Sequence, residues 1–186
     1  NCRLAIINAA KHKKKRRNVQ KVMDNLDFYA KDLSERLVRL DFTSPYRTRI
    51  IKDGLSGKER ELQIPAFYPD QCAHHAIVQV LQPLIMKSSY YWSCANIPNR
   101  GIDRAAKGVE RATMRDIKHA KYCVKMDIHK FYPSIPHDKL KEHLQRKIKD
   151  KKALGIIHLV IDSYHSSPGH GIPCLLYTSP SPRDTR

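Results

Sequence analysis

The segment Lys125–Ile135 contains the residue types best suited to chemistry: Lys-Met-Asp-Ile-His-Lys-Phe-Tyr-Pro-Ser-Ile. Asp127 stands near the end of a run in which apolar and polar residues alternate, and the aromatic pair Phe131-Tyr132 follows it. A carboxylate oxygen is the kind of ligand that a hard divalent cation such as Mg²⁺ prefers. Asp127 therefore gives this segment one metal ligand of the right type, and the alternative is a surface aspartate that caps the following turn.

Three further segments carry short motifs in a fixed order around Lys125–Ile135. Lys58–Pro65 combines cations with an Ile-Pro end, Pro98–Gly101 has an Arg-Gly turn before a helical pattern, and Gly169–Pro173 reads Gly-His-Gly-Ile-Pro. Glycines in such a turn let the backbone approach a ligand closely. Each motif is weak alone, and their order along the chain is the stronger signal.

These four segments together resemble the reverse transcriptase family over residues 58–173. Lys125–Ile135 is similar to the first palm motif of the family, and Gly169–Pro173 to the opening of the next one. Lys58–Pro65 resembles the fingers hairpin, and Pro98–Gly101 the second fingers motif. The pattern His-His-Ala, Arg-Gly and Phe-Tyr-Pro-Ser-Ile-x-His is most similar to bacterial and phage enzymes, including those of diversity-generating retroelements.

The resemblance implies an RNA-directed DNA polymerase that joins a dNTP to a primer 3′-hydroxyl on an RNA template by a two-metal mechanism. Asp127 is then the catalytic residue and a metal ligand through its carboxylate. Ile128 is a second metal ligand through its backbone carbonyl. The expected cofactor is a pair of Mg²⁺ ions, with Mn²⁺ as the alternative.

The resemblance also implies residues that bind substrates. Lys58 and Arg60 would bind the dNTP through charge-assisted contacts to its triphosphate. Tyr132 would also line the dNTP site, as a steric gate against a 2′-hydroxyl. The residues expected to contact template and nucleotide are Arg100, Gly171, Ile172 and Pro173.

Two features depart from the family pattern. Asp70-Gln71 stands where the family commonly has Asp-Arg, so one expected cation is missing. The second catalytic carboxylate pair of the family, Tyr-x-Asp-Asp, does not occur in the 186 residues. We therefore expect a fragment that does not polymerise by itself.

The charge of the chain favours nucleic acid as a partner. Lys and Arg number 35 against 18 Asp and Glu, which gives a formal net charge of +17. Such a field attracts polyanions. The expected partners are an RNA template, a DNA primer and dNTPs, with an accessory protein as a further candidate. The alternative on charge alone is a lysine-rich protein without a nucleic-acid role.

The cysteines and the hydropathy pattern bear on the compartment. The five cysteines are odd in number, widely spaced and without a Cys-x-x-Cys pair, which favours reduced thiols over a disulfide framework or a structural zinc site. No apolar run is long enough to cross a bilayer, so no membrane partner is expected. The predicted location is the cytoplasm, for a bacterial or phage-encoded protein.

The elements that must position these motifs can be predicted from periodicity and turn signals. Apolar residues at steps of three and four predict a helix over residues 18–40, and a second helix begins near Pro69-Asp70 and kinks or ends at Pro83. Strands are predicted over 46–52, 58–64 and 121–128, a loop over 88–101, and helices over 102–118, from Pro136, and over 154–164. This order predicts an α+β fold, with the right-hand polymerase architecture reduced to fingers and part of the palm.

The predicted organisation has four parts. Residues 1–44 form a basic helical N-terminal region, 45–120 the fingers and 121–173 a partial palm. Residues 174–186 resemble a translated sequencing adaptor, so we expect a non-native tail, with a genuine Pro/Ser-rich tail as the alternative. The sequence also starts without Met, which agrees with the expectation of a fragment.

Two other functions fit parts of this pattern. One is a basic helical module that binds RNA without catalysis. The other is a related palm polymerase from a phage-defence system, with a different mode of priming. The second carboxylate pair, beyond the residues given, would separate the first of these from a polymerase.

Overall fold

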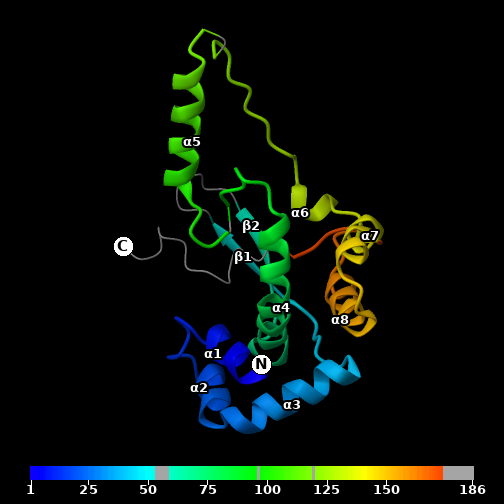
Figure 1. Ribbon diagram of the computed structural model, residues 1–186. Coiled ribbons are helices and arrows are strands. Elements are labelled where there is room, and N and C mark those ends of the chain that lie inside the picture. Colours follow the sequence, from blue (N-terminus) through cyan, green and yellow to red (C-terminus); the bar gives the residue numbers. More distant parts are fainter. Residues whose placement is uncertain (53–58, 96, 119, 174–186) are drawn as a thin grey trace. The chain divides into compact units, whose positions relative to one another are not determined.

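The computed structural model describes residues 1–52, 59–95, 97–118 and 120–173 (Figure 1). The chain is α+β, with helices in the majority and a two-stranded antiparallel sheet among the described residues. Packing divides the chain into two units. The first unit contains residues 1–79 and the chain from residue 130 onward, and the second contains residues 80–129.

The first unit begins with three helices, α1 (Cys2–Ala9), α2 (Arg17–Asp24) and α3 (Leu26–Arg39). The single helix predicted over residues 18–40 was wrong in one respect, because the backbone leaves helical geometry at Asn25, with φ −122° and ψ 43°. The Asn25 side chain donates a hydrogen bond to the carbonyl of Lys21 at 3.4 Å. Asparagine competes in this way for backbone groups that a continuous helix would use.

The hairpin consists of β1 (Arg47–Lys52) and β2 (Glu59–Ile64), as the sequence predicted. The strands are antiparallel, with Arg47 opposite Ile64 at one end and Lys52 opposite Glu59 at the other. The Lys52 ammonium lies 3.5 Å from the Glu59 carboxylate. The predicted turn at residues 53–57 lies outside the described residues.

A turn, η1 (Phe67–Gln71), leads from the hairpin into α4 (Cys72–Ser88). The helix continues through Pro83, so the end predicted there is wrong, and the alternative, a kink at Pro83, stays a prediction. Ala73 is buried, whereas Val80 and Leu84 are 63% and 46% exposed. The core-facing part of α4 is therefore its first two turns.

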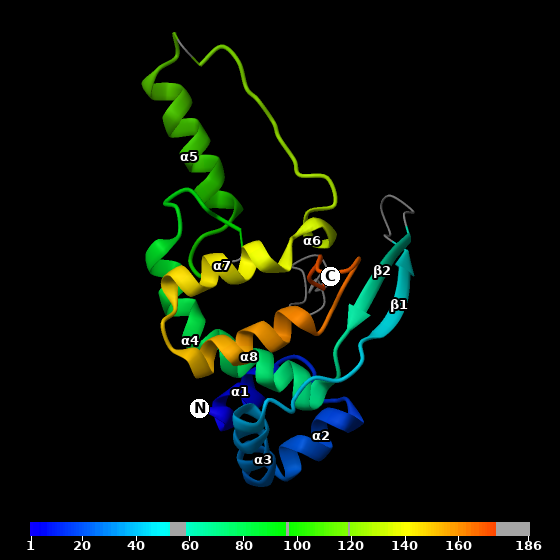
Figure 2. The same cartoon turned by 90° about the vertical axis from the view of Figure 1, so that its right-hand side faces the viewer.

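The first unit ends with α6 (Phe131–Ser134), α7 (His137–Lys147) and α8 (Lys151–Asp162). Helices α7 and α8 pack side by side (Figure 2). The predicted helix over 154–164 starts earlier, because the Asp150 side chain caps it by accepting hydrogen bonds from the amides of Lys152 and Ala153 at 2.8 and 3.1 Å. Such a cap satisfies amides that have no partner inside the helix.

The core of the first unit lies where α1, α2 and α3 meet η1 and the start of α4. Asp70 is a buried charged residue of this region, at 1% exposure, and its carboxylate accepts hydrogen bonds from the amide (2.8 Å) and the hydroxyl of Ser44. A buried carboxylate needs such partners to offset the loss of water. The buried members of this core are Ile6, Ala9, Ala10, Val19, Val22, Leu33, Phe42, Phe67, Cys72 and Ala73.

The second unit consists of the end of α4, a loop, α5 (Ile102–Arg115) and an irregular segment. The loop and the helix agree with the prediction, but the strand predicted over 121–128 does not form. Tyr122 is 94% exposed and Met126 is 87% exposed. A strand satisfies its backbone groups through a neighbouring strand, and no described strand pairs with this segment.

None of the described helices combines the length and apolar content that a bilayer-spanning segment needs.

Candidate functional site

Two motifs separated by more than thirty residues are hydrogen-bonded to each other in the first unit. The amide of Gly171 donates to the carbonyl of Ile135 at 2.8 Å, and the amide of Ile172 donates to the carbonyl of Tyr132 at 3.1 Å. Tyr132 and Ile172 were predicted separately as nucleotide-contacting residues. The fold brings these predicted site residues together by direct backbone contact.

His137 joins the same two segments from the first turn of α7. Its amide donates to the carbonyl of Gly169 at 2.9 Å, and its Nε2 lies 2.6 Å from the carbonyl oxygen of Gly171. Because a carbonyl can only accept, Nε2 must carry the hydrogen. The side chain is only 3% exposed. His137 therefore fixes the turn at Gly169–Pro173 against α7, a role that the sequence analysis did not assign.

Asp162, at the end of α8, lies on the other side of the His137 ring. Its carboxylate is 3.4 Å from Nδ1 of His137 and 2.7 Å from the ammonium of Lys141. Burial alone would raise the pKa of Asp162, but the hydrogen bonds and charges of Lys141 and His137 outweigh burial and hold this pKa below its usual value. The ionised carboxylate thus ties both α7 and His137 to α8.

Gly171 is required by the geometry of the turn. Its φ is +95°, a region that L side chains rarely adopt, and a Cβ at this position would lie 2.3 Å from Oγ of Ser166. That hydroxyl is 2.6 Å from the carbonyl of Pro133. Ser166 therefore occupies the space that a side chain at 171 would need, and it also binds the motif segment. Pro173 is buried at the end of the turn.

The Tyr132 ring remains accessible beside this turn. Tyr132 is 39% exposed, and its ring meets that of Phe131 edge-on, with centroids 5.4 Å apart. An aromatic ring fixed at its base and open at its face can restrict the shape of a bound sugar or base. This exposure is compatible with the predicted role of Tyr132.

Asp127 and Ile128 lie in the second unit, in the irregular segment that precedes α6. Both residues are exposed. A carboxylate and a carbonyl are oxygen donors of the type that Mg²⁺ takes, but two ligands do not complete its octahedral shell. Among the described residues, no group of three or more His, Cys, Asp or Glu side chains converges on one point. The metal role of Asp127 and Ile128 stays a prediction.

One of the two predicted triphosphate ligands, Arg60, belongs to the hairpin. Arg60 is on β2, where its backbone pairs with Ile51 of β1. Lys58 lies outside the described residues. Their roles also stay predictions.

Arg100 lines a second site, a pocket of about 650 Å³ in the second unit. One of its guanidinium nitrogens, Nη1, lies 2.9, 3.3 and 3.4 Å from the carbonyls of Tyr90, Tyr91 and Ser93. Arg100 therefore holds the loop before α5 in shape, a structural role that was not foreseen. Its direct contact with the template stays a prediction.

Cations and aromatic rings alternate around this pocket. Arg104 stacks on the ring of Tyr91, with its guanidinium carbon 4.6 Å from the ring centroid. Trp92 packs on Gly108, where a Cβ would lie 2.3 Å from the indole ring. Lys107 and Arg111 line the pocket from the same helix, together with one acidic residue, Asp103. The spacing 104, 107, 108 and 111 along one helix face could have revealed this pocket, and the sequence analysis missed it.

No protein-family model matches the chain, and no curated protein matches it. The function is therefore inferred from the chain's own residues and from the order of motifs over residues 58–173.

The turn geometry predicts different costs for two glycine substitutions. Gly169 has φ +70°, but a Cβ added there would meet no atom within 4 Å, whereas Gly171 has both positive φ and a clash. Gly169→Ala should lower the free energy of unfolding by about 1 kcal/mol, from backbone strain alone. Gly171→Ala should lower it by about 2 kcal/mol or more, because overpacking adds to the strain. Urea unfolding followed by far-UV circular dichroism measures both.

Hydrogen exchange gives a local check on the same pair of variants. Gly171→Ala should speed exchange of the Ile172 amide, which donates to Tyr132, more than Gly169→Ala does. Equal effects of the two variants on unfolding and exchange would contradict the packing of Ser166 against Gly171.

Proposed function

We propose that the chain is part of an RNA-directed DNA polymerase of the right-hand fold, comprising the fingers and a part of the palm. The observation that supports this most is the hydrogen-bonded contact between Tyr132–Ile135 and Gly171-Ile172. In the family that the sequence resembles, these two motifs meet at the incoming nucleotide. A nucleotide site shared by the two motifs requires them to lie next to each other, and this contact meets that requirement.

The chemistry divides between bound ions and the chain's own residues. A pair of divalent cations would activate the primer 3′-hydroxyl and neutralise charge on the triphosphate, and Asp127 and Ile128 would provide ligands for them. Tyr132 limits the space beside the sugar. At Gly169 a Cβ would meet no atom within 4 Å, so the absence of a side chain there lets the backbone of the turn approach the base pair.

Primer extension tests the role of Asp127. In a chain long enough to include the second carboxylate pair, Asp127→Asn should reduce extension of a DNA primer on an RNA template by at least about a thousandfold, because it removes a ligand that the transition state requires. Binding of the primer–template should stay within about twofold, because one carboxylate contributes little to phosphate contacts. The matched control is Asp24→Asn, at an exposed position on α2.

Retained extension by Asp127→Asn would exclude the assignment of this motif. For the 186 residues alone, which contain no Tyr-x-Asp-Asp, we expect binding that weakens with salt and no extension.

Sugar discrimination tests the role of Tyr132. Tyr132→Ala should raise incorporation of ribonucleotides relative to deoxyribonucleotides by about tenfold or more, because the ring no longer meets the 2′-hydroxyl. Tyr132→Phe keeps the ring and should leave the ratio unchanged. Single-nucleotide incorporation on one template measures the ratio. If Tyr132→Ala and Tyr132→Phe gave the same ratio, the gate would have to lie elsewhere.

A second candidate function, RNA binding without catalysis, is favoured by the pocket beside α5. Its cations and its two aromatic residues, Tyr91 and Trp92, match the needs of a single strand, which binds by backbone charge and base stacking. A polymerase could use the same pocket. The Asp127→Asn experiment separates the two functions, because a binding module would show no extension to lose.

Trp92 is the sole tryptophan of the chain and reports directly on this pocket. Single-stranded RNA should quench its emission, since a base would stack near the indole. Gly108→Ala should shift the emission to longer wavelength and weaken the quenching, because the Cβ displaces the ring from α5. Gly101→Ala is the control, since a Cβ there meets nothing within 4 Å. Unchanged emission in Gly108→Ala would contradict the packing of Trp92 on α5.

A further inference from the structure

A pocket of about 500 Å³ lies in the first unit beside α2, η1 and the end of the hairpin where Arg47 meets Ile64. Four cations line it: Lys13, Arg16 and Lys21 come from one stretch of the sequence, and Arg47 comes from β1. None of its described lining residues is acidic. The pocket thus concentrates positive charge in a concave site, where low-dielectric walls strengthen the field.

Lys13 is held in place by Gln71. The Lys13 ammonium donates to Oε1 of Gln71 at 2.8 Å, and Nε2 of Gln71 donates to the carbonyl of Pro65 at 2.9 Å. This bridge fixes the basic run at residues 11–17 against the end of β2. An ammonium has three N–H donors, so the bond to Gln71 leaves two for a ligand.

The pKa values of two neighbouring groups respond to the positive charge around this pocket. The pKa of Lys13 is lowered by burial and by the charge of Arg16. The pKa of His75, on α4, is lowered by burial and then by Lys13, His74 and Lys11. A bound anion would relieve the repulsion that both shifts express.

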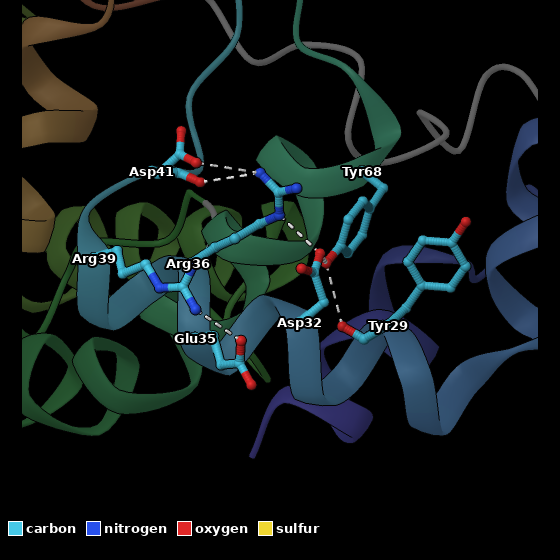
Figure 3. A network of polar contacts seen from close by, with 7 residues as sticks. All are labelled: Tyr29, Asp32, Glu35, Arg36, Arg39, Asp41 and Tyr68. Atoms are coloured by element: carbon cyan, nitrogen blue, oxygen red, sulfur yellow. Dashed lines mark hydrogen bonds and ion pairs between the residues drawn. The ribbon is translucent and has the colours of Figure 1, made fainter.

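A carboxylate on the aromatic side of the pocket, that of Asp32, is already engaged. Asp32 accepts a hydrogen bond from the Tyr68 hydroxyl and another from Nε of Arg36 at 2.7 Å (Figure 3). These two bonds, with Tyr68 the stronger influence, lower the pKa of Asp32 against the opposing effect of burial. Asp32 therefore stays ionised within its own network.

The same network fixes the aromatic wall of the pocket. The Tyr68 hydroxyl is 3.3 Å from the carbonyl of Tyr29, and the two rings meet edge-on with centroids 4.8 Å apart. Both tyrosines line the pocket. The site thus offers cations on one side and prearranged ring surface on the other.

We propose that this pocket binds the backbone phosphates of a single-stranded RNA. Positive charge without acidic lining selects an anion, and the ring surface of Tyr29 and Tyr68 suits the sugar and base beside a phosphate. Exposed cations continue outside the pocket at Lys14, Lys15 and Arg17, so successive phosphates of a polymer find partners where a single nucleotide would not. The site shares Ile64 and Pro65 with the motif Lys58–Pro65, but it contains none of the residues proposed for catalysis or dNTP binding. The proposal therefore holds even if Asp127 has no catalytic role.

Lysine variants inside and outside the pocket provide the test. Fluorescence anisotropy of a labelled single-stranded RNA, about twelve nucleotides long, measures its affinity for the full 186-residue chain. Lys13→Gln and Lys21→Gln should each weaken binding about tenfold, as the loss of a charge-assisted hydrogen bond implies. Lys31→Gln removes the same charge from an exposed position on α3 that does not line the pocket, and it should cost about twofold or less. Equal losses in all three variants would overturn the proposal in favour of diffuse attraction.

Gln71→Glu tests the pocket without removing a cation. The new carboxylate would pair with Lys13 and should weaken RNA binding about tenfold, with far-UV circular dichroism as the check on folding. Wild-type affinity in this variant would overturn the proposal.

Competition distinguishes the sources of phosphate. Unlabelled RNA should displace the probe, whereas dATP or inorganic phosphate at the same phosphate concentration should not. Displacement by dATP at the same efficiency as RNA, with the pocket variants resisting it, would overturn the proposal and identify a mononucleotide site instead.

Discussion

Backbone hydrogen bonds between Tyr132–Ile135 and Gly171-Ile172 are the constraint on which the candidate site depends. They demand a turn with positive φ at Gly171, and they leave space there for the Ser166 hydroxyl but not for a side chain. The buried side chain of His137 holds the turn in place: one ring nitrogen donates to the Gly171 carbonyl, and the other faces Asp162. A strained turn persists only where its surroundings hold it in place, and here two helices do so.

The excess positive charge of the chain is arranged in two different ways. In the second unit, Arg100 and Arg104 both donate hydrogen bonds to loop carbonyls, and Arg104 also stacks on the ring of Tyr91. Some of their N–H donors therefore hold the pocket wall in place and are not open to a ligand. In the first unit, the Lys13 ammonium donates one hydrogen bond to Gln71, which leaves two N–H donors for a ligand. Position 71 is where the resembled family commonly has an arginine. The fold places the ammonium of Lys13 next to the Gln71 side chain. A positive charge that the sequence lacks at position 71 is thus supplied by a residue from another part of the chain.

The irregular segment before α6 shows how a strong local pattern can fail to form its element. Residues 121–128 alternate apolar and polar side chains, yet the structure leaves them exposed and without a strand partner among the described residues. Alternation specifies which residues would share a face. It cannot supply the neighbouring strand whose amides and carbonyls make that face stable. Asp127 lies on this segment and is exposed.

Local information determined most of the elements in this chain. The hairpin strands and the helix over Ile102–Arg115 follow from side-chain periodicity, which acts within a few residues. The α+β class follows from the order of these elements. The break at Asn25 and the passage of α4 through Pro83 did not follow, because each depends on how neighbouring turns compete for the same backbone groups.

Tertiary structure alone decided which residues meet. Nothing in the sequence near Gln71 indicates that Lys13 bonds to it. Likewise, nothing near Tyr132 indicates that the turn at Gly171 is hydrogen-bonded both to this segment and to His137. These contacts join positions far apart in the sequence, and their energies arise from burial and from the exclusion of water once the core has formed. Sequence therefore determined the chemical character of the candidate site residues. Their positions next to one another depend on packing, because packing joins residues far apart in the sequence, whereas periodicity relates only residues a few positions apart.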